Sequence, residues 1–308
     1  MKANIYTTLL CGAMLMLCFS CSNEKDIHAE LEAPVYNVTD NSSDPVQHQR
    51  FLFYQDYKTY LITKPEIKDY RFNFQTKNNI LMIAPTQSND VLLGGVDMLK
   101  SLFLDVYSTD FKKKHLPFSI ILADSIFYLG QDVGRPYYHS YASQRFLALG
   151  GVRREMATYS DSLKLAIKGD IHSRYWIDFL QGAKGVFSIP EEFEEISKSY
   201  YGKGVDYIAD LGNVTGRLPW QIDYHQLGFI TYNHNTTFYD DAEGAWWIEV
   251  PNADVDKRQW VAFFFNTPKS QRDALIAAYP KMKAKYDILK EAFLKCEGFD
   301  VDQLPRSA

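Results

Sequence analysis

The stretch HSRYWIDFLQ, from His172 to Gln181, predicts a helix that the rest of the chain packs around. Apolar side chains recur at one-turn spacing along it and make two adjacent ridges. The ridges are Ile171, Tyr175 and Phe179 in one row, and Trp176 and Leu180 in the next. Arg174, Asp178 and Gln181 share the opposite face, where Arg174 and Asp178 can form an ion pair one turn apart. We therefore expect a core helix with one polar face.

Apolar runs upstream of that helix predict short strands. The run from Ile80 to Ala84 and the segment PFSIILADS, from Pro117 to Ser125, are short enough for buried strands, and YRFNF at Tyr70 to Phe74 alternates. Between them, apolar residues at helical spacing predict a helix whose first turn is left undefined by Gly94 and Gly95. Those apolar residues are Val96, Leu99, Phe103 and Val106.

The C-terminal segment carries the clearest helical pattern. Its apolar residues step by four and three: Leu275, Tyr279, Met282, Tyr286, Leu289 and Phe293. Pro280 lies inside the run, so either the helix kinks there or a second helix begins with Pro in its first turn. We expect an α+β fold, a mixed α/β domain over residues 51–308 with a small sheet and a long C-terminal helix.

The first twenty residues predict a lipoprotein signal peptide. Lys2 gives a positive start, an apolar stretch runs from about Leu9 to Phe19, and Cys21 opens a polar, acidic segment. Cys21 is then the lipid-bearing first residue of an exported protein held at a membrane. Cleavage before Cys18, an ordinary cleaved signal peptide and an uncleaved anchor stay open as alternatives.

Residues 21–50 predict a flexible tether because they are polar and interrupted by Pro34 and Pro45. The acidic residues after Cys21 resemble the surface-export signals of Bacteroidetes lipoproteins. The formal net charge of -5 offers no general phosphate-neutralising surface, which argues against nucleic acid as a partner. Once the leader is removed and Cys21 is acylated, Cys296 is left alone, so neither a disulfide framework nor a cysteine zinc site is available.

The order of segments in the second half carries a family resemblance. A helix ending DFLQGA is followed by FSIPEEFEEISKSYYG, then LGFITYNHNTTFYDDAEGAWW, then a Lys-rich helix and GFDVDQL. This order resembles the zinc-binding metallopeptidase lipoproteins of Bacteroidetes, also described as substrate import-associated zinc metallohydrolases. The resemblance implies a zincin-like fold and a setting at the outer membrane, in nutrient import served by a TonB-dependent transporter.

The chain departs from that family in the helix that should hold the metal. The family's helix reads HHEFxHxLHQ, in which two imidazoles one turn apart hold zinc and a Glu acts as the base. Alignment on Gln181 puts the ligands at Ser173 and Ile177 and the base at Arg174. Alignment on His172 puts the base at Ser173 and the second ligand at Trp176. Neither register supplies a zinc site, so we expect no catalytic residues and no cofactor on this helix.

A relocated metal site is the alternative. His225 and His234 are followed by an acidic group comprising Asp240, Asp241 and Glu243, so a His/carboxylate zinc site is conceivable. The competing interpretation is that both histidines are solvated in loops and that Asp240 and Asp241 lie near a helix N-terminus.

Aromatic residues supply the binding candidates. Trp246 and Trp247, together with Trp220 and Tyr224, could form a wall on which a sugar or peptide stacks. The competing interpretation is an aromatic core, because consecutive rings usually point to different faces. A second candidate is Tyr137, Tyr138 and His139 with Tyr141.

Three hypotheses for the function follow. The first is a membrane-anchored, non-catalytic relative of a zinc metallohydrolase that binds a glycan or peptide, or assists nutrient import at the outer membrane. The second is a zinc metallohydrolase that uses the relocated site. The third is a structural accessory lipoprotein without a small ligand.

Overall fold

The structure is a computed structural model that describes residues 35–71, 79–128 and 138–304. The chain divides into two compact units, Met1–Asn37 and Val38–Ala308, and every helix and strand named below belongs to the second. Cys21, the predicted leader and residues 21–34 of the predicted tether lie outside the described residues, as does most of the alternating stretch after Tyr70. No helix among the described residues combines the length and apolar character needed to cross a membrane.

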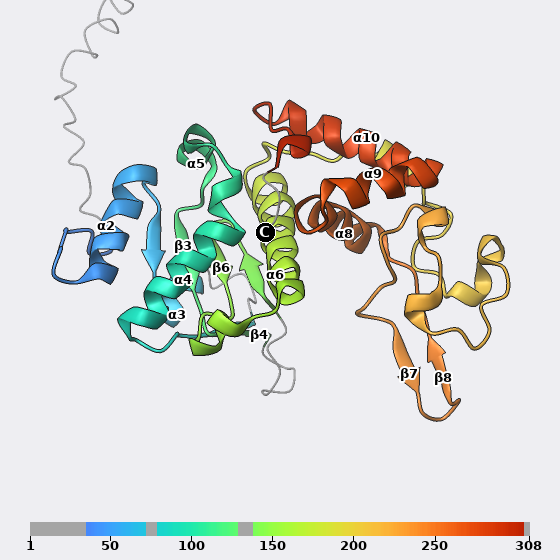
Figure 1. The fold of residues 1–308 in the computed structure, drawn as a ribbon, viewed down its shortest axis with the longest axis horizontal. Helices are drawn as coiled ribbons and strands as arrows, with labels where there is room; N and C mark the ends of the chain where they lie inside the picture. Colours follow the sequence, from blue (N-terminus) through green and yellow to red (C-terminus); the bar gives the residue numbers. More distant parts are fainter. Residues whose placement is uncertain (1–34, 72–78, 129–137, 305–308) are drawn as a thin grey trace, which may run out of the picture. The chain divides into compact units, whose positions relative to one another are not determined.

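The main sheet has four strands in the order β1-β3-β6-β5. Figure 1 labels two of them, β3 and β6. They are β1 at Tyr60–Ile62, β3 at Ser119–Leu122, β6 at Phe146–Leu149 and β5 at Ser140–Ala142. β1, β3 and β6 run parallel, and β5 pairs antiparallel with β6 at the edge. Every residue of β3 and β6 is buried, as expected for parallel strands covered on both faces. The strand predicted within PFSIILADS is confirmed.

A second, two-stranded sheet joins β2 at Ile80–Ile83 to β4 at Ser125–Tyr128 in antiparallel register. β2 confirms the strand predicted from the apolar run at Ile80. β4 follows β3 after only two residues, so the chain turns from one sheet into the other at Asp124, whose N–H bonds the Ile83 carbonyl.

The first described helix, α2 at Pro45–Tyr57, corrects the predicted tether. Asp44 caps it by accepting hydrogen bonds of 3.1 Å from the N–H groups of Val46 and Gln47, and Pro45 fits the first turn because it needs no N–H partner there. The prediction of a flexible segment was therefore wrong for residues 45–50, where capping and a proline start a helix.

Further helices lie along the chain between β1 and residue 195. They are α3 at Ile67–Tyr70, α4 at Asn89–Leu102, η1 at Leu104–Val106, α5 at Thr109–His115, η2 at Arg154–Thr158, α6 at Asp161–Ser173, η3 at Arg174–Ala183 and α7 at Glu192–Glu195. α4 confirms the helix predicted around Val96, but it begins at Asn89, before the glycine pair rather than after it. The ridge of Val96, Leu99 and Phe103 is buried.

Three helices end the chain, and Pro280 separates two of them. They are α8 at Ala253–Asn266, α9 at Lys269–Ala278 and α10 at Pro280–Lys295, followed by a short η8 at Val301–Gln303. α10 begins at Pro280, so the second of the two predicted alternatives is correct. Met282, Leu289 and Phe293 of α10 are buried in the main core, which confirms the inward-facing ridge.

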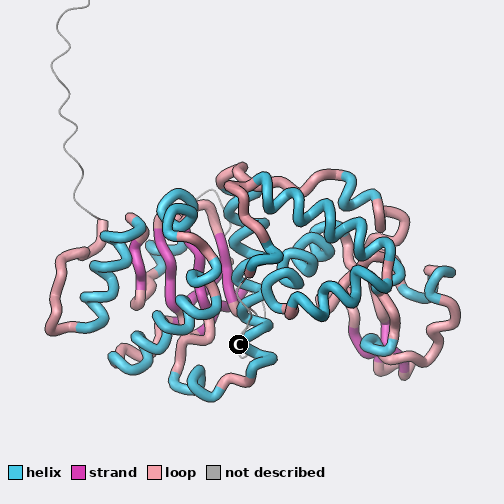
Figure 2. The backbone as a smooth tube through the Cα atoms, turned by 45° about the horizontal axis from the view of Figure 1, so that its top comes forward, coloured by secondary structure: helices cyan, strands magenta, loops and turns pink. Residues whose placement is uncertain are grey.

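Residues 205–250 build a small core of their own beside the main one. Short helices η4 at Val205–Tyr207, η5 at Ala209–Leu211, η6 at Pro219–Gln221 and η7 at His225–Leu227 precede a hairpin of β7 at Phe238–Asp240 and β8 at Ala245–Trp247. Val205, Leu227, Phe229 and Val250 are buried together in this cluster. Figure 2 shows the loops of this region and the hairpin. The fold is mixed helix and sheet, as predicted.

Candidate functional site

The predicted core helix is formed by α6 and its π-helical continuation η3. Tyr175, Trp176, Phe179 and Leu180 are almost fully buried, so the two apolar ridges are confirmed. The five residues that the alignments place at metal-site positions all lie on this helix. They are His172, Ser173, Arg174, Trp176 and Ile177.

His172 is a core residue with both ring nitrogens engaged. Its Nε2 lies 3.1 Å from the Leu102 carbonyl, which can only accept, so Nε2 carries the proton and Nδ1 accepts from the Tyr107 hydroxyl at 2.7 Å. The ring stacks on Phe265 at 3.9 Å between centroids. Burial, with a smaller effect of the Lys168 charge, lowers the pKa of His172 well below its ordinary value. The imidazole is neutral and has no lone pair free for a metal.

The other degenerate positions are no better suited to zinc. Trp176 is fully buried and donates its indole N–H to the Tyr107 hydroxyl at 2.9 Å. Ser173 and Ile177 are also buried, and Ile177 offers only hydrocarbon. A zinc site needs several nitrogen, sulfur or carboxylate ligands, and this turn of helix supplies none that is free.

Arg174, the position of the base in the predicted alignment on Gln181, is the centre of a charge network. Its guanidinium lies 3.7 Å from Asp170 and 3.4 Å from Asp178, so the predicted Arg174 pairing with Asp178 is confirmed. Asp178 also pairs with Arg258 of α8 at 2.6 Å, and Asp170 accepts from the Ser140 hydroxyl at 2.7 Å. The polar face of the helix thus carries two cations and two carboxylates that pair with one another.

These contacts answer whether the zinc implied by the resemblance fits the helix. A dication at this turn would meet the positive charge of Arg174 and would have to displace a buried imidazole from two hydrogen bonds. The side chains of this turn include too few of the nitrogen, sulfur or carboxylate ligands that zinc requires. The residues present do not fit the metal.

The residues of the relocated site are each held by other neighbours. His225 contacts Asp223 at 3.3 Å and the ring of Tyr279, whereas His234 is exposed and lies against Tyr232. Asp240 folds the hairpin turn by accepting from the Ala242 and Glu243 N–H groups, so its predicted place at a helix N-terminus was wrong. Asp241 and Glu243 are exposed at that turn. Among residues 35–71, 79–128 and 138–304, no group of three or more His, Cys, Asp or Glu side chains is placed to hold a metal ion.

Three of the aromatic side chains form a continuous surface row, which we call the aromatic wall: Trp220, Trp246 and Tyr239. The Trp246 ring lies 6.2 Å from Trp220 and 5.7 Å from Tyr239, both edge-to-face. Trp220 is 65% exposed and Tyr239 48% exposed, whereas Trp246 is half-buried against the small core. The hairpin register places Tyr239 opposite Trp246, so both rings lie on one face of the hairpin.

Two other predicted members of the wall lie elsewhere. Tyr224 is only 4% exposed and donates its hydroxyl to the Pro219 carbonyl, so its assignment to an exposed wall was wrong. Trp247 is 41% exposed but faces the other side of the hairpin, opposite Phe238, because neighbouring strand residues alternate. The alternative that all these rings are core is wrong for Trp220 and Trp247.

Sequence reasoning missed three exposed rings of this region, Tyr207, Phe238 and Tyr239. The signal for two of them was present: FYD and AWW flank the turn sequence DAEG, which is typical of a hairpin with aromatic pairs on both strands. Tyr207 gave no such signal, since it reaches the surface beside Gly204 only through the fold of the small core.

Of the second predicted aromatic site, Tyr137, Tyr138 and His139 with Tyr141, the rings of Tyr138 and Tyr141 lie beside the charge network of Arg174. The Arg174 guanidinium lies 5.3 Å from the ring of Tyr138, and Tyr138 meets Tyr141 edge-to-face. Burial, with the nearby Asp178 charge, raises the pKa of Tyr141. Tyr137 lies outside the described residues, and the His139 carbonyl accepts a hydrogen bond from the Gly150 N–H at 2.8 Å beside the β5–β6 pair.

Comparison with known proteins gives one loose likeness. No protein-family model and no curated protein matches the chain. Among solved structures, the chain is similar to a protein of Bacteroides caccae described as a "putative zinc-binding metallo-peptidase", with 15% sequence identity and a TM-score of 0.48 over 86% of this chain and 90% of that one. The family resemblance therefore stays a prediction from the sequence.

Proposed function

We propose that this chain is a non-catalytic binding protein, anchored at the outer membrane through Cys21, whose aromatic wall binds carbohydrate. Its role is that of an accessory in nutrient import beside a TonB-dependent transporter. The single observation that carries the binding proposal is the exposed row of Trp220, Trp246 and Tyr239. The anchor and the transporter rest on the leader sequence and on the family resemblance.

Contiguous exposed aromatic rings favour a binding role because leaving them in water costs free energy. Scattered apolar residues on a surface are ordinary, whereas a connected patch marks a site of interaction. Aromatic rings have an electron-rich face, which attracts the polarised C–H groups on one face of a sugar ring. The exposed carboxylates of Asp241 and Glu243 at the same hairpin can accept hydrogen bonds from sugar hydroxyls.

The non-catalytic part of the proposal rests on the helix that would hold zinc. His172 is neutral and doubly hydrogen-bonded, and Arg174 is paired with Asp170 and Asp178. Converting this helix to a metal site would require new side chains at several positions. These side chains leave no ligand free for a metal on this helix, which supports a binding role at another surface.

A polysaccharide panel tests the binding proposal on the mature chain, with Cys21→Ser to keep it in solution. Affinity electrophoresis identifies the glycan, and calorimetry then gives its Kd. We expect Trp220→Ala and Trp246→Ala each to weaken binding about tenfold, equivalent to about 1.4 kcal/mol. Trp247→Ala is the matched control, since this ring lies on the opposite face of the same hairpin.

Three results would contradict the proposal. Equal losses from all three tryptophan variants would mean that the hairpin had unfolded or that the wall is not the site. Binding of peptides but of no glycan would move the ligand to another class. One equivalent of zinc in protein purified without chelator, with hydrolysis that chelator abolishes, would restore the metallohydrolase hypothesis.

A further inference from the structure

A cleft of about 670 Å³ lies where α6, the turn between α8 and α9, and the C-terminal η8 meet. Three cationic side chains, Lys168, Lys269 and Arg272, contribute to its lining, together with the rings of Phe264 and Phe265. The volume is in the range of sites for small organic ligands. None of these residues belongs to the aromatic wall.

Lys168 is the most unusual of the three cations. Its side chain is only 7% exposed, yet it has no hydrogen bond and no ion pair among the residues that the structure describes. Burial lowers the pKa of its ammonium group. Because a buried cation without a partner costs free energy, a negatively charged group entering the cleft beside Lys168 would be stabilised.

Arg272 adds a second charge without a carboxylate partner. It is 2% exposed and donates to the carbonyls of Phe264 at 2.5 Å and Val301 at 3.2 Å. Its Nε is buried with no hydrogen-bond partner in the described part of the chain, and no carboxylate there lies within 4.0 Å of it. The carbonyls and the Phe264 ring, 5.4 Å away, orient the guanidinium, but no carboxylate among the described residues pairs with it.

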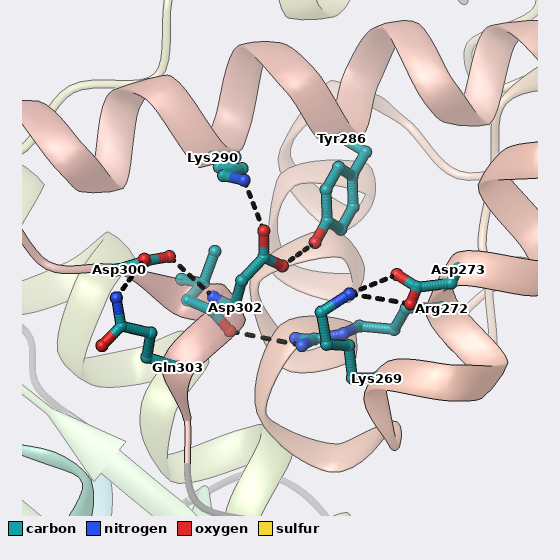
Figure 3. A network of polar contacts seen from close by, with 9 residues as sticks. Lys269, Arg272, Asp273, Tyr286, Lys290, Asp300, Asp302 and Gln303 are labelled. Atoms are coloured by element: carbon teal, nitrogen blue, oxygen red, sulfur yellow. Dashed lines mark hydrogen bonds and ion pairs between the residues drawn. The ribbon is translucent and has the colours of Figure 1, made fainter.

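The two carboxylates at the cleft are already neutralised by other cations (Figure 3). Asp273 pairs with Lys269 at 2.7 Å, and Asp302 is held by Lys290 and by the Tyr286 hydroxyl. The excess positive charge therefore belongs to Lys168 and Arg272. The N-terminus of α9, which no side chain caps, faces the same region and adds the positive end of its dipole.

We propose that this cleft binds a small organic carboxylate that carries an apolar body. The carboxylate meets Lys168 and Arg272, and the apolar part lies along the partly exposed side chains of Val106 and Leu304, which line the same cleft. Val106 and Leu304 keep part of their apolar surface accessible, so they favour such a ligand over inorganic phosphate, which would leave that surface in contact with water. The proposal is independent of the glycan site and of any metal.

Benzoate is a suitable probe because benzamide has nearly the same shape without the charge, and acetate has the charge without the ring. Calorimetry with the full mature chain, carrying Cys21→Ser, should show benzoate binding tighter than about 10 mM, with both comparison compounds at least tenfold weaker. Lys168→Met should weaken benzoate binding at least tenfold. Lys269→Met is the matched control, since Lys269 is half-exposed and already paired, and it should change Kd by less than about threefold.

Thermal unfolding gives a second readout that does not depend on calorimetric signal. Without ligand, the Lys168→Met variant should have a higher Tm than the native protein, because the substitution removes an unpaired buried charge. Saturating benzoate should raise the Tm of the native protein and leave that of Lys168→Met unchanged. The proposal would be overturned if benzamide bound as tightly as benzoate, or if phosphate bound more tightly than benzoate. It would also be overturned if Lys168→Met bound benzoate as tightly as the native protein, or if benzoate did not bind.

Discussion

The imidazole of His172 and the hydroxyl of Tyr107 are joined by a 2.7 Å hydrogen bond in the centre of the main core. The same hydroxyl accepts from the Trp176 indole at 2.9 Å, so one oxygen satisfies two buried groups of the core helix. This arrangement requires the neutral imidazole, because Nδ1 must offer a lone pair to Tyr107. A position that looks like a remnant of a metal site is thereby a structural element of the core.

The neutral state of His172 predicts a pH-dependent stability. Its pKa in the fold lies well below its ordinary value, so between the two pKa values the unfolded chain binds the proton and the fold does not. The contribution is fully present above about pH 6.5 and is lost as the pH falls below it, by up to about 1.4 kcal/mol per pH unit. We expect urea unfolding between pH 7 and 5.5 to show that the free energy of unfolding falls less steeply with pH for His172→Gln than for the native chain.

Comparison with His172→Gln isolates this residue because other groups titrate in both proteins. His115 and His225 also have lowered pKa values through burial. Asp256 has a raised pKa and acts in the opposite direction. Identical slopes for the two proteins would show that His172 binds equal numbers of protons in the folded and unfolded states, which contradicts a lowered pKa.

Removal of the Tyr107 hydroxyl should be costly because two groups lose their partner. Tyr107→Phe leaves the Trp176 N–H and the His172 Nδ1 unpaired in the core, at about 1–3 kcal/mol for each group. Tyr175→Phe is the matched control, since its equally buried hydroxyl serves only the His115 carbonyl at 3.0 Å. Chemical denaturation should show the larger loss for Tyr107→Phe, and a larger loss for Tyr175→Phe would contradict this account.

Local patterns predicted the elements that depend on nearby residues. The ridges of the helix around Trp176, the buried strand at Ile120 and the inward face of α10 follow from spacing alone. The choice at Pro280 between a kink and a new helix could not be made from spacing, since both place the same residues inward. The missed helix at Pro45 shows that a capping Asp and a proline can outweigh a polar composition.

The candidate site was predictable only in part because exposure depends on distant contacts. Trp220 and Tyr224 are four residues apart, yet the first is exposed and the second is buried, and the difference arises from the small core formed with Val205, Phe229 and Val250. The cleft beside Lys168 gave no sequence signal at all. Lys168 and Arg272 are over a hundred residues apart and line one cleft only after α6, α8 and α9 have packed.

A buried ion pair between Asp256 of α8 and Lys285 of α10 makes a third prediction. The pair is fully buried with a 2.5 Å contact, and Tyr201 donates to the same carboxylate at 2.8 Å. Burial raises the pKa of Asp256 to about 6 and lowers that of Lys285. Removing one partner strands the other charge, so Asp256→Asn and Lys285→Met should each destabilise by about 3–5 kcal/mol.

The double variant Asp256→Asn with Lys285→Met should recover much of that loss, since neither charge remains and Asn can still accept from Tyr201. A double-mutant cycle from urea unfolding at pH 7 measures the coupling. Additive losses would show that the two charges do not depend on each other.

A fourth prediction concerns Gly94 and Gly95 of α4, which have different neighbours. A Cβ at Gly95 would lie 2.4 Å from the Val152 side chain and 3.3 Å from that of Leu122, both packed in the core. At Gly94 it would meet only the flexible end of Met156, at 2.4 Å. Alanine gains about 1 kcal/mol of helix propensity at either position, but overpacking at Gly95 costs about 1–3 kcal/mol. Chemical denaturation should find Gly94→Ala neutral or more stable than the native chain and Gly95→Ala less stable, whereas equal shifts would mean that Val152 moves as freely as Met156.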